Sequence, residues 1–292
     1  MQAAKDMETI GFIGTGVMGK SMAGHLLKAG YPVQVYTRSP SKAHSLLDSG
    51  ATWADSPAAL ARTCGVIFTI VGFPQDVEAV YLGPEGLLAN MKTGAILVDM
   101  TTSRPDLAKR IWQEALARGG QALDAPVSGG DKGAREATLS IMVGGEEEAF
   151  ARVLPIFELM GKNIVLQGPA GSGQYCKMCN QITIASNMLG VCEALAYAKK
   201  SGLDPTRVLK SISSGAAGSW SLENLGPRML AGDHAPGFYI KHFIKDMLIA
   251  QESARALGMD TPGLDTALSL YQRLAQQGEE NSGTQALIKH YQ

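Results

Sequence analysis

Ile10-Gly11-Phe12-Ile13-Gly14-Thr15-Gly16-Val17-Met18-Gly19 is the stretch that decides the fold of this chain. An apolar run leads into three glycines spaced Gly-x-Gly-x-x-Gly, and Met22, Leu26 and Leu27 follow at helical spacing. In such a strand–turn–helix unit the glycines permit a tight turn, a close approach of a pyrophosphate, and close packing of helix on strand. The helix N-terminus adds free N–H groups for the phosphates. Residues 14–19 are therefore predicted to bind a nicotinamide or flavin dinucleotide; the alternative is a turn that binds nothing.

The residues after the next apolar run, 33–36, indicate which dinucleotide is bound. An acidic residue about 20 positions beyond the glycines would bind a ribose 2′-hydroxyl. The chain instead has Thr37-Arg38-Ser39. A guanidinium binds a 2′-phosphate in fork geometry, and a charge-assisted hydrogen bond contributes about 1.5–3 kcal/mol. The sequence therefore favours NADP, with NAD possible; the alternative is an ordinary solvated arginine.

Composition excludes several classes of protein. The chain has 292 residues, 45% of them apolar, and a formal net charge of −1. This length suggests one large or two smaller domains, and the charge balance argues against a nucleic-acid surface. No apolar run is long enough to span a membrane. Residues 1–8 carry Lys5, Asp6 and Glu8 without an apolar segment, so no secretory signal is predicted and a cytoplasmic location is expected.

The first half of the chain alternates between strand and helix patterns. Apolar runs typical of strands occupy residues 10–13, 33–36, 66–71, 95–98, 122–127, 139–143 and 164–166. Helical patterns occupy residues 41–49, 57–61, 105–118 and 146–160. This order predicts an α/β domain with a Rossmann-type, doubly wound parallel sheet over residues 1–167.

The pattern changes after residue 167. From Gln174 to Ser201 there is no proline and one glycine, and apolar residues lie on nearly every face. We expect one helix of about 42 Å, at about 1.5 Å per residue, that ends at Gly202 and is buried between domains or subunits. Further helical patterns cover residues 205–213, 221–230, 238–257 and 264–277. Residues 168–292 are therefore predicted to form an all-α C-terminal domain with a long interdomain helix.

The segment Asp124-Ala125-Pro126-Val127-Ser128-Gly129-Gly130 follows a predicted strand. Pro126 has no N–H to donate, so strand pairing is expected to end near it. Ser128, Gly129 and Gly130 offer a hydroxyl and closely spaced backbone N–H groups, which suit an anion such as a carboxylate. The alternative is an ordinary glycine turn.

The start of the long helix, Gly171-Ser172-Gly173-Gln174-Tyr175-Cys176-Lys177-Met178-Cys179-Asn180, carries two polar residues on one face. Ser172 is expected to cap the helix, and Lys177 and Asn180 are three residues apart. Loss of hydration, the helix N-terminus and an oxidised nicotinamide would all lower the pKa of this lysine. A lysine with such a pKa exchanges a proton with an alcohol or carbonyl. The alternative is a lysine that reaches the surface.

The cysteines do not indicate a metal site. Cys176 and Cys179 form one Cys-x-x-Cys within a predicted helix, with no second pair nearby, and the histidines show no matching spacing. Cys64, Cys176, Cys179 and Cys192 are therefore predicted to be small buried side chains, and no metal is expected. Lys241, Lys245 and Asp246 lie on one later helix, where composition alone predicts a solvated face with ion pairs.

These motifs, in this order, resemble the β-hydroxyacid dehydrogenase family, which includes 3-hydroxyisobutyrate dehydrogenases, tartronate semialdehyde reductases and glyoxylate/succinic semialdehyde reductases. The resemblance covers essentially the whole chain. Residues 14–19 are similar to the family's cofactor loop, 124–130 to its substrate loop and 171–180 to its catalytic segment, and Lys245-Asp246 to its C-terminal pair.

The resemblance implies a role for each matching residue. It implies that Lys177 is the general acid/base, that Asn180 positions the reacting oxygen, and that Ser128, Gly129 and Gly130 bind the substrate carboxylate. For the cofactor, it implies contacts from Lys245, Asp246, Thr102, Phe73 and Pro74. Because the long helix is shared between subunits in the family, a homodimer or homotetramer is implied.

Two further residues bear on the substrate. Lys241 is unexpected for the family and is interpreted as a partner for a second anionic group, or else as a surface cation. Trp220 is interpreted as a wall of the substrate pocket, or else as a packing aromatic. Neither residue identifies the substrate.

The sequence thus predicts an NADP-preferring oxidoreductase that transfers a hydride between the nicotinamide and a small β-hydroxyacid or the corresponding semialdehyde. Alternatives on related architectures are a 6-phosphogluconate dehydrogenase, an imine reductase and a sensor or reader protein that binds the dinucleotide without turnover. The presence of Lys177 argues against the last two.

Overall fold

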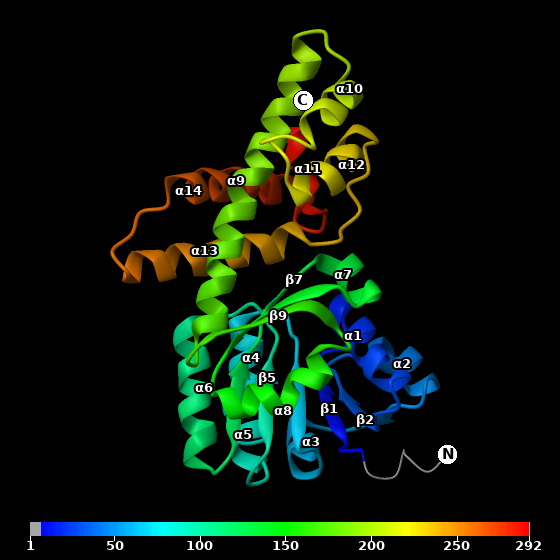
Figure 1. Ribbon diagram of the computed structural model, residues 1–292, viewed down its shortest axis with the longest axis vertical. Helices are drawn as coiled ribbons and strands as arrows, with labels where there is room; N and C mark the ends of the chain where they lie inside the picture. Colours follow the sequence, from blue (N-terminus) through cyan, green and yellow to red (C-terminus); the bar gives the residue numbers. More distant parts are fainter. Residues whose placement is uncertain (1–6, 292) are drawn as a thin grey trace. The chain divides into compact units, whose positions relative to one another are not determined.

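The computed structural model describes residues 7–291 (Figure 1). Residues 1–6, on which part of the prediction about a secretory signal rests, lie outside the described residues, as does Gln292. The chain divides into two compact units, Met1–Lys177 and Met178–Gln292. The predicted domain boundary at residues 167/168 stays a prediction.

The first unit contains one nine-stranded sheet with the order β3-β2-β1-β4-β5-β6-β8-β7, and β9 also pairs with β8. Its strands are β1 (Ile10–Ile13), β2 (Val33–Tyr36), β3 (Thr52–Trp53), β4 (Val66–Thr69), β5 (Ile96–Asp99), β6 (Gln121–Asp124), β7 (Val127–Ser128), β8 (Leu139–Gly144) and β9 (Gly161–Gly168). The pairings among β1–β6 are all parallel, as predicted. Strand β8 runs antiparallel to β6 and β7, which the sequence pattern did not indicate.

Helices cover both faces of this sheet. They are α1 (Val17–Lys28), α2 (His44–Asp48), α3 (Pro57–Thr63), α4 (Pro74–Leu82), α5 (Leu87–Asn90), α6 (Pro105–Ala117), α7 (Gly130–Glu136) and α8 (Glu147–Phe157), with a 3₁₀ turn (Pro40–Ala43) before α2. One core joins α1, α2 and α8 to the sheet, and a second joins α3, α4, α5 and α6 to it. Strands β1, β4 and β5 are buried along their whole length because both faces of the sheet are covered.

The register of the strands brings several loops to one edge of the sheet. Ile13 pairs with Tyr36 and with Thr69, and Asp99 pairs with Thr69 and with Asp124. The carboxyl ends of β2, β1, β4, β5 and β6 are therefore level with one another. The loops that follow them carry the predicted cofactor and substrate residues. In parallel α/β sheets this carboxyl edge is where ligands bind.

Proline and glycine set several boundaries that the apolar pattern missed. The predicted strand 122–127 is divided, because pairing of β6 ends at Asp124 and β7 begins only after Pro126. The short elements β3, β7, α5 and α7 lack a run long enough to show periodicity, and α4 follows directly on Pro74.

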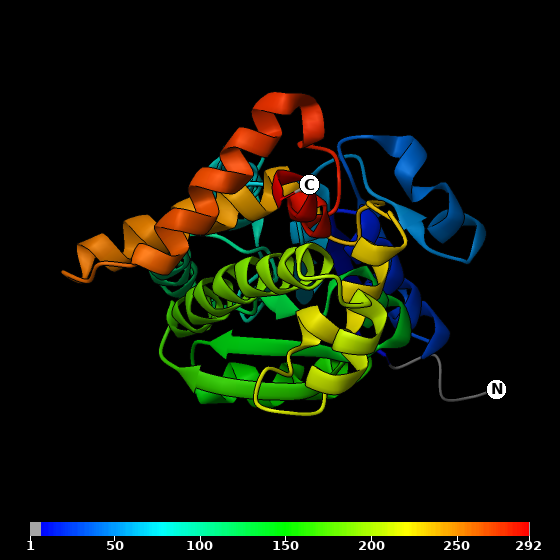
Figure 2. The ribbon, with the colours of Figure 1, turned by 90° about the horizontal axis from the view of Figure 1, so that it is seen from above.

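The second unit is helical. Helix α9 (Ser172–Lys200) begins in the first unit and continues into the second; α10 (Pro205–Ile212), α11 (Trp220–Asn224), α12 (Gly226–Leu230), α13 (Ile240–Ala256) and α14 (Pro262–Leu274) follow. Short helical segments at Ala275–Glu279 and Thr284–Tyr291 complete it. Helices α13 and α14 pack side by side (Figure 2). Among residues 178–291 the only β pairing is a single bridge between Tyr239 and Gly283.

Helix α9 has a buried stripe and an exposed side in the single chain. The buried stripe consists of Met178, Ala185, Met188, Val191, Cys192, Leu195 and Ala198. Tyr197, on the other side, is 73% exposed. The prediction that all four cysteines are buried is wrong for two of them: Cys179 is exposed and Cys176 half-buried, because both lie off the stripe.

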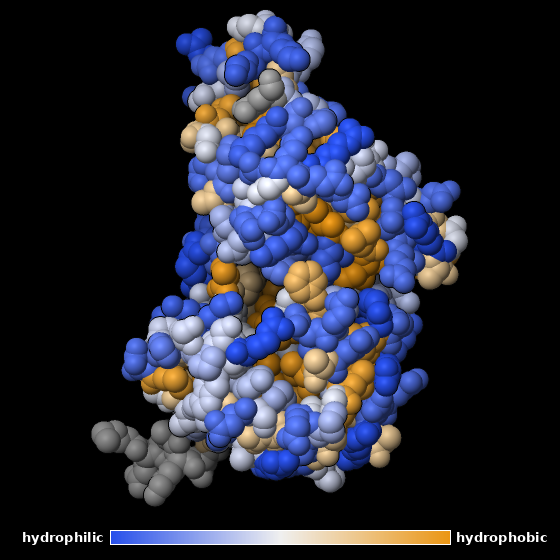
Figure 3. Space-filling view, turned by 180° about the vertical axis from the view of Figure 1, so that it is seen from behind, coloured by the Kyte–Doolittle hydropathy of each residue, from blue (hydrophilic) through white to orange (hydrophobic). Residues whose placement is uncertain are grey.

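Apolar side chains also reach the surface elsewhere. Figure 3 shows one face on which hydrophilic side chains predominate and apolar ones emerge in several patches. In the second unit the exposed large apolar residues are Tyr197, Leu203, Trp220, Leu230, Leu248, Leu257 and Met259. None of the helices within residues 7–291 combines the length and the apolar character needed to cross a membrane.

Candidate functional site

The glycine turn between β1 and α1 has the shape that a dinucleotide requires. Gly14 has a φ of +94°, and a Cβ there would overlap the carbonyl oxygen of Ile70. A Cβ on Gly19 would overlap the carbonyl oxygen of Gly14. A Cβ on Gly16, in contrast, would meet no atom within 4 Å. Two glycines are therefore needed for packing, whereas the third faces open space where a pyrophosphate can approach the backbone.

The first turn of α1 keeps its N–H groups available for an anion. Its N-cap is Gly16, which has no side chain to cap it, and no acidic residue lies in the turn. Thr15 is 2% exposed, and its Oγ1 has no hydrogen-bond partner among the described residues. Val17 is exposed and Met18 half-buried beside it. These features fit the phosphates of a dinucleotide.

Arg38 lies beside the loop that begins α4. Its guanidinium Nη1 is 2.9 Å from Asp76 Oδ1, and its side chain is 84% exposed. The backbone N–H of Phe73 donates to Asp76 Oδ2 at 3.2 Å. The structure thus brings Arg38 together with Phe73 and Pro74, the predicted adenosine-side residues. Thr37 is buried next to Arg38, and Ser39 is the N-cap of the following 3₁₀ turn.

Gln174 ties the start of α9 to the loop after β5. Its Nε2 donates to the carbonyl oxygen of Thr101 at 2.8 Å, and its Oε1 accepts from the N–H of Ser103 at 2.9 Å. The two backbone groups on either side of Thr102 are therefore fixed by one fully buried amide. Sequence reasoning missed Gln174; its only signal was a glutamine beside the glycines that begin a mostly apolar helix.

Asp124 caps helix α9 from the end of β6. Its carboxylate accepts from the N–H of Gly171 at 2.7 Å and of Gln174 at 2.8 Å. Burial raises the pKa of Asp124, and these backbone hydrogen bonds oppose the rise. The expected cap, Ser172, is instead the first residue of the helix.

Close packing at this junction requires glycine. A Cβ on Gly173 would overlap the carbonyl oxygen of Met142, and a Cβ on Gly144 would lie 2.6 Å from Asp124 Oδ1. The Gly171-Ser172-Gly173 motif thus lets α9 begin directly against the sheet.

Lys177 and Asn180 lie in the first turns of the helix that these contacts fix. Lys177 is 6% exposed, and Asn180 is half-buried three residues later. A buried lysine in an apolar helix is the environment that the sequence predicted for this side chain.

A chain of hydrogen bonds within the second unit joins Asn180 to Lys245. Asn180 Nδ2 donates to Gln181 Oε1 at 2.7 Å, and Gln181 Nε2 donates to Asp246 Oδ2 at 2.6 Å. The other carboxylate oxygen, Oδ1, is 2.8 Å from Lys245 Nζ. Asp246 is 2% exposed and the Lys245 side chain 12%, so the solvated face predicted from composition is wrong for this pair. Gln181 was not predicted.

The predicted carboxylate loop follows β7. Ser128 pairs with Ser140 at the end of the strand, and Gly129 and Gly130 have φ values of +131° and +62°. All three residues are half-buried. The positive φ values explain why glycine is used at both positions.

Lys241 and Trp220 lie outside the hydrogen-bonded chain of Asn180, Gln181, Asp246 and Lys245. Lys241 is exposed; its Nζ donates to Asn281 Oδ1 at 2.8 Å and lies 5.2 Å from the centre of the Tyr239 ring. Trp220, the first residue of α11, is 55% exposed. Both side chains are accessible in the single chain.

Comparisons with known proteins agree with these motifs. The family model for the NAD binding domain of 6-phosphogluconate dehydrogenase matches residues 9–168, and that for the NAD-binding domain of NADP-dependent 3-hydroxyisobutyrate dehydrogenase matches residues 171–291. An oxidoreductase of Bacillus subtilis is 62% identical over 97% of this chain and 98% of its own length. The 2-hydroxy-3-oxopropionate reductase of Escherichia coli is 42% identical over 96% of each chain.

A solved structure supports the same relationship. Psf3 in complex with NADP⁺ and 2-OPP has a TM-score of 0.90 and 28% identity, covering 97% of this chain and 100% of that chain. The chain belongs to the β-hydroxyacid dehydrogenase family. The predicted fold and the prediction of an NAD(P)-dependent hydroxyacid dehydrogenase are therefore confirmed.

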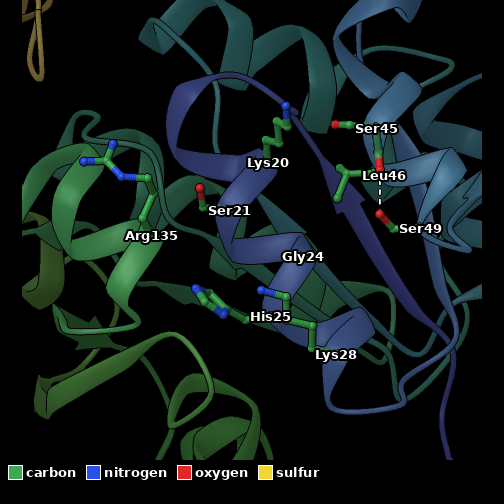
Figure 4. A pocket seen from close by; sticks show the side chains of 9 residues that line it. All are labelled: Lys20, Ser21, Gly24, His25, Lys28, Ser45, Leu46, Ser49 and Arg135. Atoms are coloured by element: carbon green, nitrogen blue, oxygen red, sulfur yellow. Dashed lines mark hydrogen bonds between the residues drawn. The ribbon is translucent and has the colours of Figure 1, made fainter.

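A separate hollow of about 380 Å³ lies on the outer side of α1 in this β-hydroxyacid dehydrogenase (Figure 4). It is lined by Lys20, Ser21, Gly24, His25, Lys28, Ser45, Leu46, Ser49 and Arg135. None of the predicted cofactor or catalytic residues is among them. Within residues 7–291, no group of three or more His, Cys, Asp and Glu side chains has the arrangement of a metal site.

Two glycine substitutions separate packing from cofactor binding. Gly16→Ala is expected to leave the fold intact, because the new methyl group meets no protein atom within 4 Å, but to weaken NADPH binding, because it occupies the approach to the phosphates. Gly14→Ala is expected to destabilise the first unit. Thermal melts and fluorescence titration with NADPH check both; a Gly16→Ala variant with wild-type affinity would contradict this assignment.

Removing the cap of α9 is expected to destabilise the first unit. Asp124→Asn leaves one oxygen to accept two buried N–H groups, which costs about 1–3 kcal/mol in the free energy of unfolding. The pKa of Asp124 is higher in the folded state than in the unfolded state, so ionisation above pH 3.8 lowers the stability of the wild type. The difference in the free energy of unfolding between wild type and Asp124→Asn is therefore expected to decrease as the pH rises above 3.8. Denaturant titrations measure this difference. Asp106→Asn, at an exposed carboxylate of α6, serves as the control and is expected to change stability by less than about 0.5 kcal/mol.

Proposed function

We propose that this enzyme transfers a hydride between NADP and a small β-hydroxyacid or the corresponding semialdehyde, with Lys177 as the general acid/base. The observation that carries the proposal is the burial of Lys177, at 6% exposure, in a helix fixed by Asp124 and Gln174. The amine of a lysine at this position is the base that alcohol oxidation requires, and its ammonium is the acid that reduction requires.

Each group has a defined part in the proposed reaction. A bound NADP supplies the hydride acceptor in oxidation and, when reduced, the hydride donor. During oxidation, the substrate O–H bond breaks as its proton passes to Lys177 Nζ, the C=O bond forms, and the carbon gives up its hydrogen with two electrons. In reduction, the Lys177 ammonium returns the proton to the oxygen. Asn180 hydrogen-bonds to that oxygen and stabilises its developing negative charge.

The substrate is proposed to be an acid because of the loop after β7. Ser128 offers a hydroxyl, and Gly129 and Gly130 offer backbone N–H groups in a half-buried position. A carboxylate accepts hydrogen bonds from such groups. The exposed ammonium of Lys241 is proposed to pair with a second anionic group of the substrate, and Trp220 to form one wall of its pocket.

The preference for NADP over NAD is proposed from Arg38. Its guanidinium has five N–H donors, and the contact with Asp76 uses only one nitrogen of the fork. The remaining donors are suited to a 2′-phosphate. The other proposed cofactor contacts come from residues 14–19, Thr37, Ser39, Phe73, Pro74, Thr102, Lys245 and Asp246. A preference for NADP favours reduction of the aldehyde as the working direction.

The enzyme is also proposed to form a homodimer or homotetramer in the cytoplasm. Large apolar side chains of the second unit, such as Tyr197 and Leu257, are exposed in the single chain. These side chains are available for contact with a second subunit. Sedimentation measurements would establish the number of subunits.

Lys177→Ala tests the catalytic assignment. Turnover of small hydroxyacids or semialdehydes is expected to fall below a few per cent of wild type, an effect of about 10²–10⁴-fold for loss of a general acid/base, while NADPH still binds. Lys200→Ala, an exposed lysine at the far end of the same helix, is the control and should keep full activity. Retained turnover in the Lys177 variant would reject the role.

Arg38→Ala tests the cofactor assignment. Loss of a charge-assisted contact to phosphate is expected to weaken NADPH binding by about 10–100-fold, the equivalent of about 1.5–3 kcal/mol, and NADH binding far less. Arg62→Ala removes an exposed arginine of α3 that bonds Asn90 and serves as the control. An equal loss for both cofactors would refute the preference for NADP.

A further inference from the structure

The residue next to Asn180 is a glutamine with no exposed surface. Gln181 is fully buried in α9, and both polar atoms of its side chain are hydrogen-bonded. We propose that Gln181 is a positioning residue that fixes the orientation of the Asn180 amide toward the reacting oxygen. This inference rests on the proposed function, in which Asn180 contacts the substrate.

The orientation of the Gln181 amide is determined by Asp246, a residue of α13. The Asp246 carboxylate is paired with Lys245, and as a carboxylate it can only accept hydrogen bonds. Gln181 must therefore turn its NH₂ group toward Asp246 Oδ2, at 2.6 Å. Because the oxygen and the nitrogen of a side-chain amide diverge from the same carbon, the carbonyl oxygen of Gln181 is then the atom that faces Asn180.

The orientation of the Gln181 amide determines that of the Asn180 amide. Gln181 Oε1 can only accept, so Asn180 must present its Nδ2 to it, at 2.7 Å. One N–H of Asn180 is then used, and the second N–H and Oδ1 are held in fixed positions. An amide that could otherwise rotate by 180° is thus locked in one orientation, with its remaining N–H available to the reacting oxygen. Preorganised donors of this kind carry much of the stabilisation of developing charge.

The same chain links two groups proposed to serve different ligands. Asn180 is assigned to the substrate, whereas Lys245, at the other end, is assigned to the cofactor. Gln181 and Asp246 connect them through buried hydrogen bonds, which are stronger in a low-dielectric interior and reinforce one another. Gln181 itself touches neither ligand in this scheme and acts only through Asn180.

Gln181→Leu keeps the volume of the side chain approximately but removes both hydrogen bonds. We expect kcat to fall about 10–100-fold, the loss typical of a misplaced catalytic contact. The Kd for NADPH is expected to change less than about threefold, because Gln181 does not contact the cofactor in this scheme. The matched control is Gln285→Leu, which removes a glutamine that is 1% exposed and bonds only the backbone oxygens of Asp233 and Ala235. This control should lower the melting temperature but keep kcat.

Gln181→Glu provides a readout that a merely structural role would not change. A protonated glutamic acid donates its O–H to Asp246 and accepts from Asn180, so it reproduces the polarity of glutamine. The ionised form can only accept, and Asp246 repels it. Asp246 contacts position 181 directly, Lys245 pairs with Asp246, and Lys177 lies one turn earlier on α9. The ratio of variant to wild-type kcat is therefore expected to rise as the pH is lowered.

A measurement without turnover separates this inference from the proposed function. In ¹⁵N-labelled protein, the side-chain NH₂ protons of Asn180 are expected to exchange with solvent about 10-fold faster or more in Gln181→Leu than in wild type. If wild type turns over no hydroxyacid or semialdehyde but exchange accelerates, the proposed function fails and the positioning stands. If exchange is unchanged, or if kcat of Gln181→Leu matches that of Gln285→Leu, the positioning role is refuted.

Discussion

The carboxylate of Asp124 at the start of α9 makes the contacts on which the proposed catalytic arrangement depends. Asp124 ends a strand of the sheet, and its carboxylate accepts hydrogen bonds from the N–H of Gly171, directly before α9, and from that of Gln174 in its first turn. A buried carboxylate without these donors would cost several kcal/mol, and a helix start without this acceptor would leave buried N–H groups unpaired. The end of β6 and the start of α9 therefore stabilise each other. Gln174 also binds the loop around Thr102 to the start of α9.

Glycine makes this arrangement possible in two places for the same reason. At the turn after β1, Gly14 and Gly19 allow the helix to approach the sheet, while a Cβ on Gly16 would meet no atom within 4 Å, so that the proposed site for the phosphates stays open. At the start of α9, Gly144 and Gly173 allow the backbone to approach Asp124 without a side chain between them. Both helices that contribute to the proposed chemistry thus begin at the carboxyl edge of the sheet, where strands of matched register deliver their loops.

Much of this could be predicted from sequence, because the informative residues are close together along the chain. The glycines of residues 14–19, the apolar strands and the spacing of Lys177 and Asn180 are local patterns, and they led to the fold and the family. The Asp124 cap, the Gln174 tether and the Gln181 chain join residues distant in sequence, and polar residue types alone do not reveal their partners. Composition also predicts burial poorly where one side of a helix is covered and the other is not. This is why Cys179 is exposed although burial was predicted, and why Lys245 is largely buried although composition predicted a solvated face.

Lys177 and Asn180 depend on a single uninterrupted helix for their mutual direction. Each residue of an α-helix turns the chain by about 100°. Deleting or inserting one residue between them would turn Asn180 and the rest of α9 by about 100° relative to Lys177, and it would also move the buried stripe away from the side chains that it contacts. This short stretch should therefore accept exchanges of amino acid at the exposed Cys179, few at the buried Met178 and almost no change in length, so that gaps in related sequences should be absent from it.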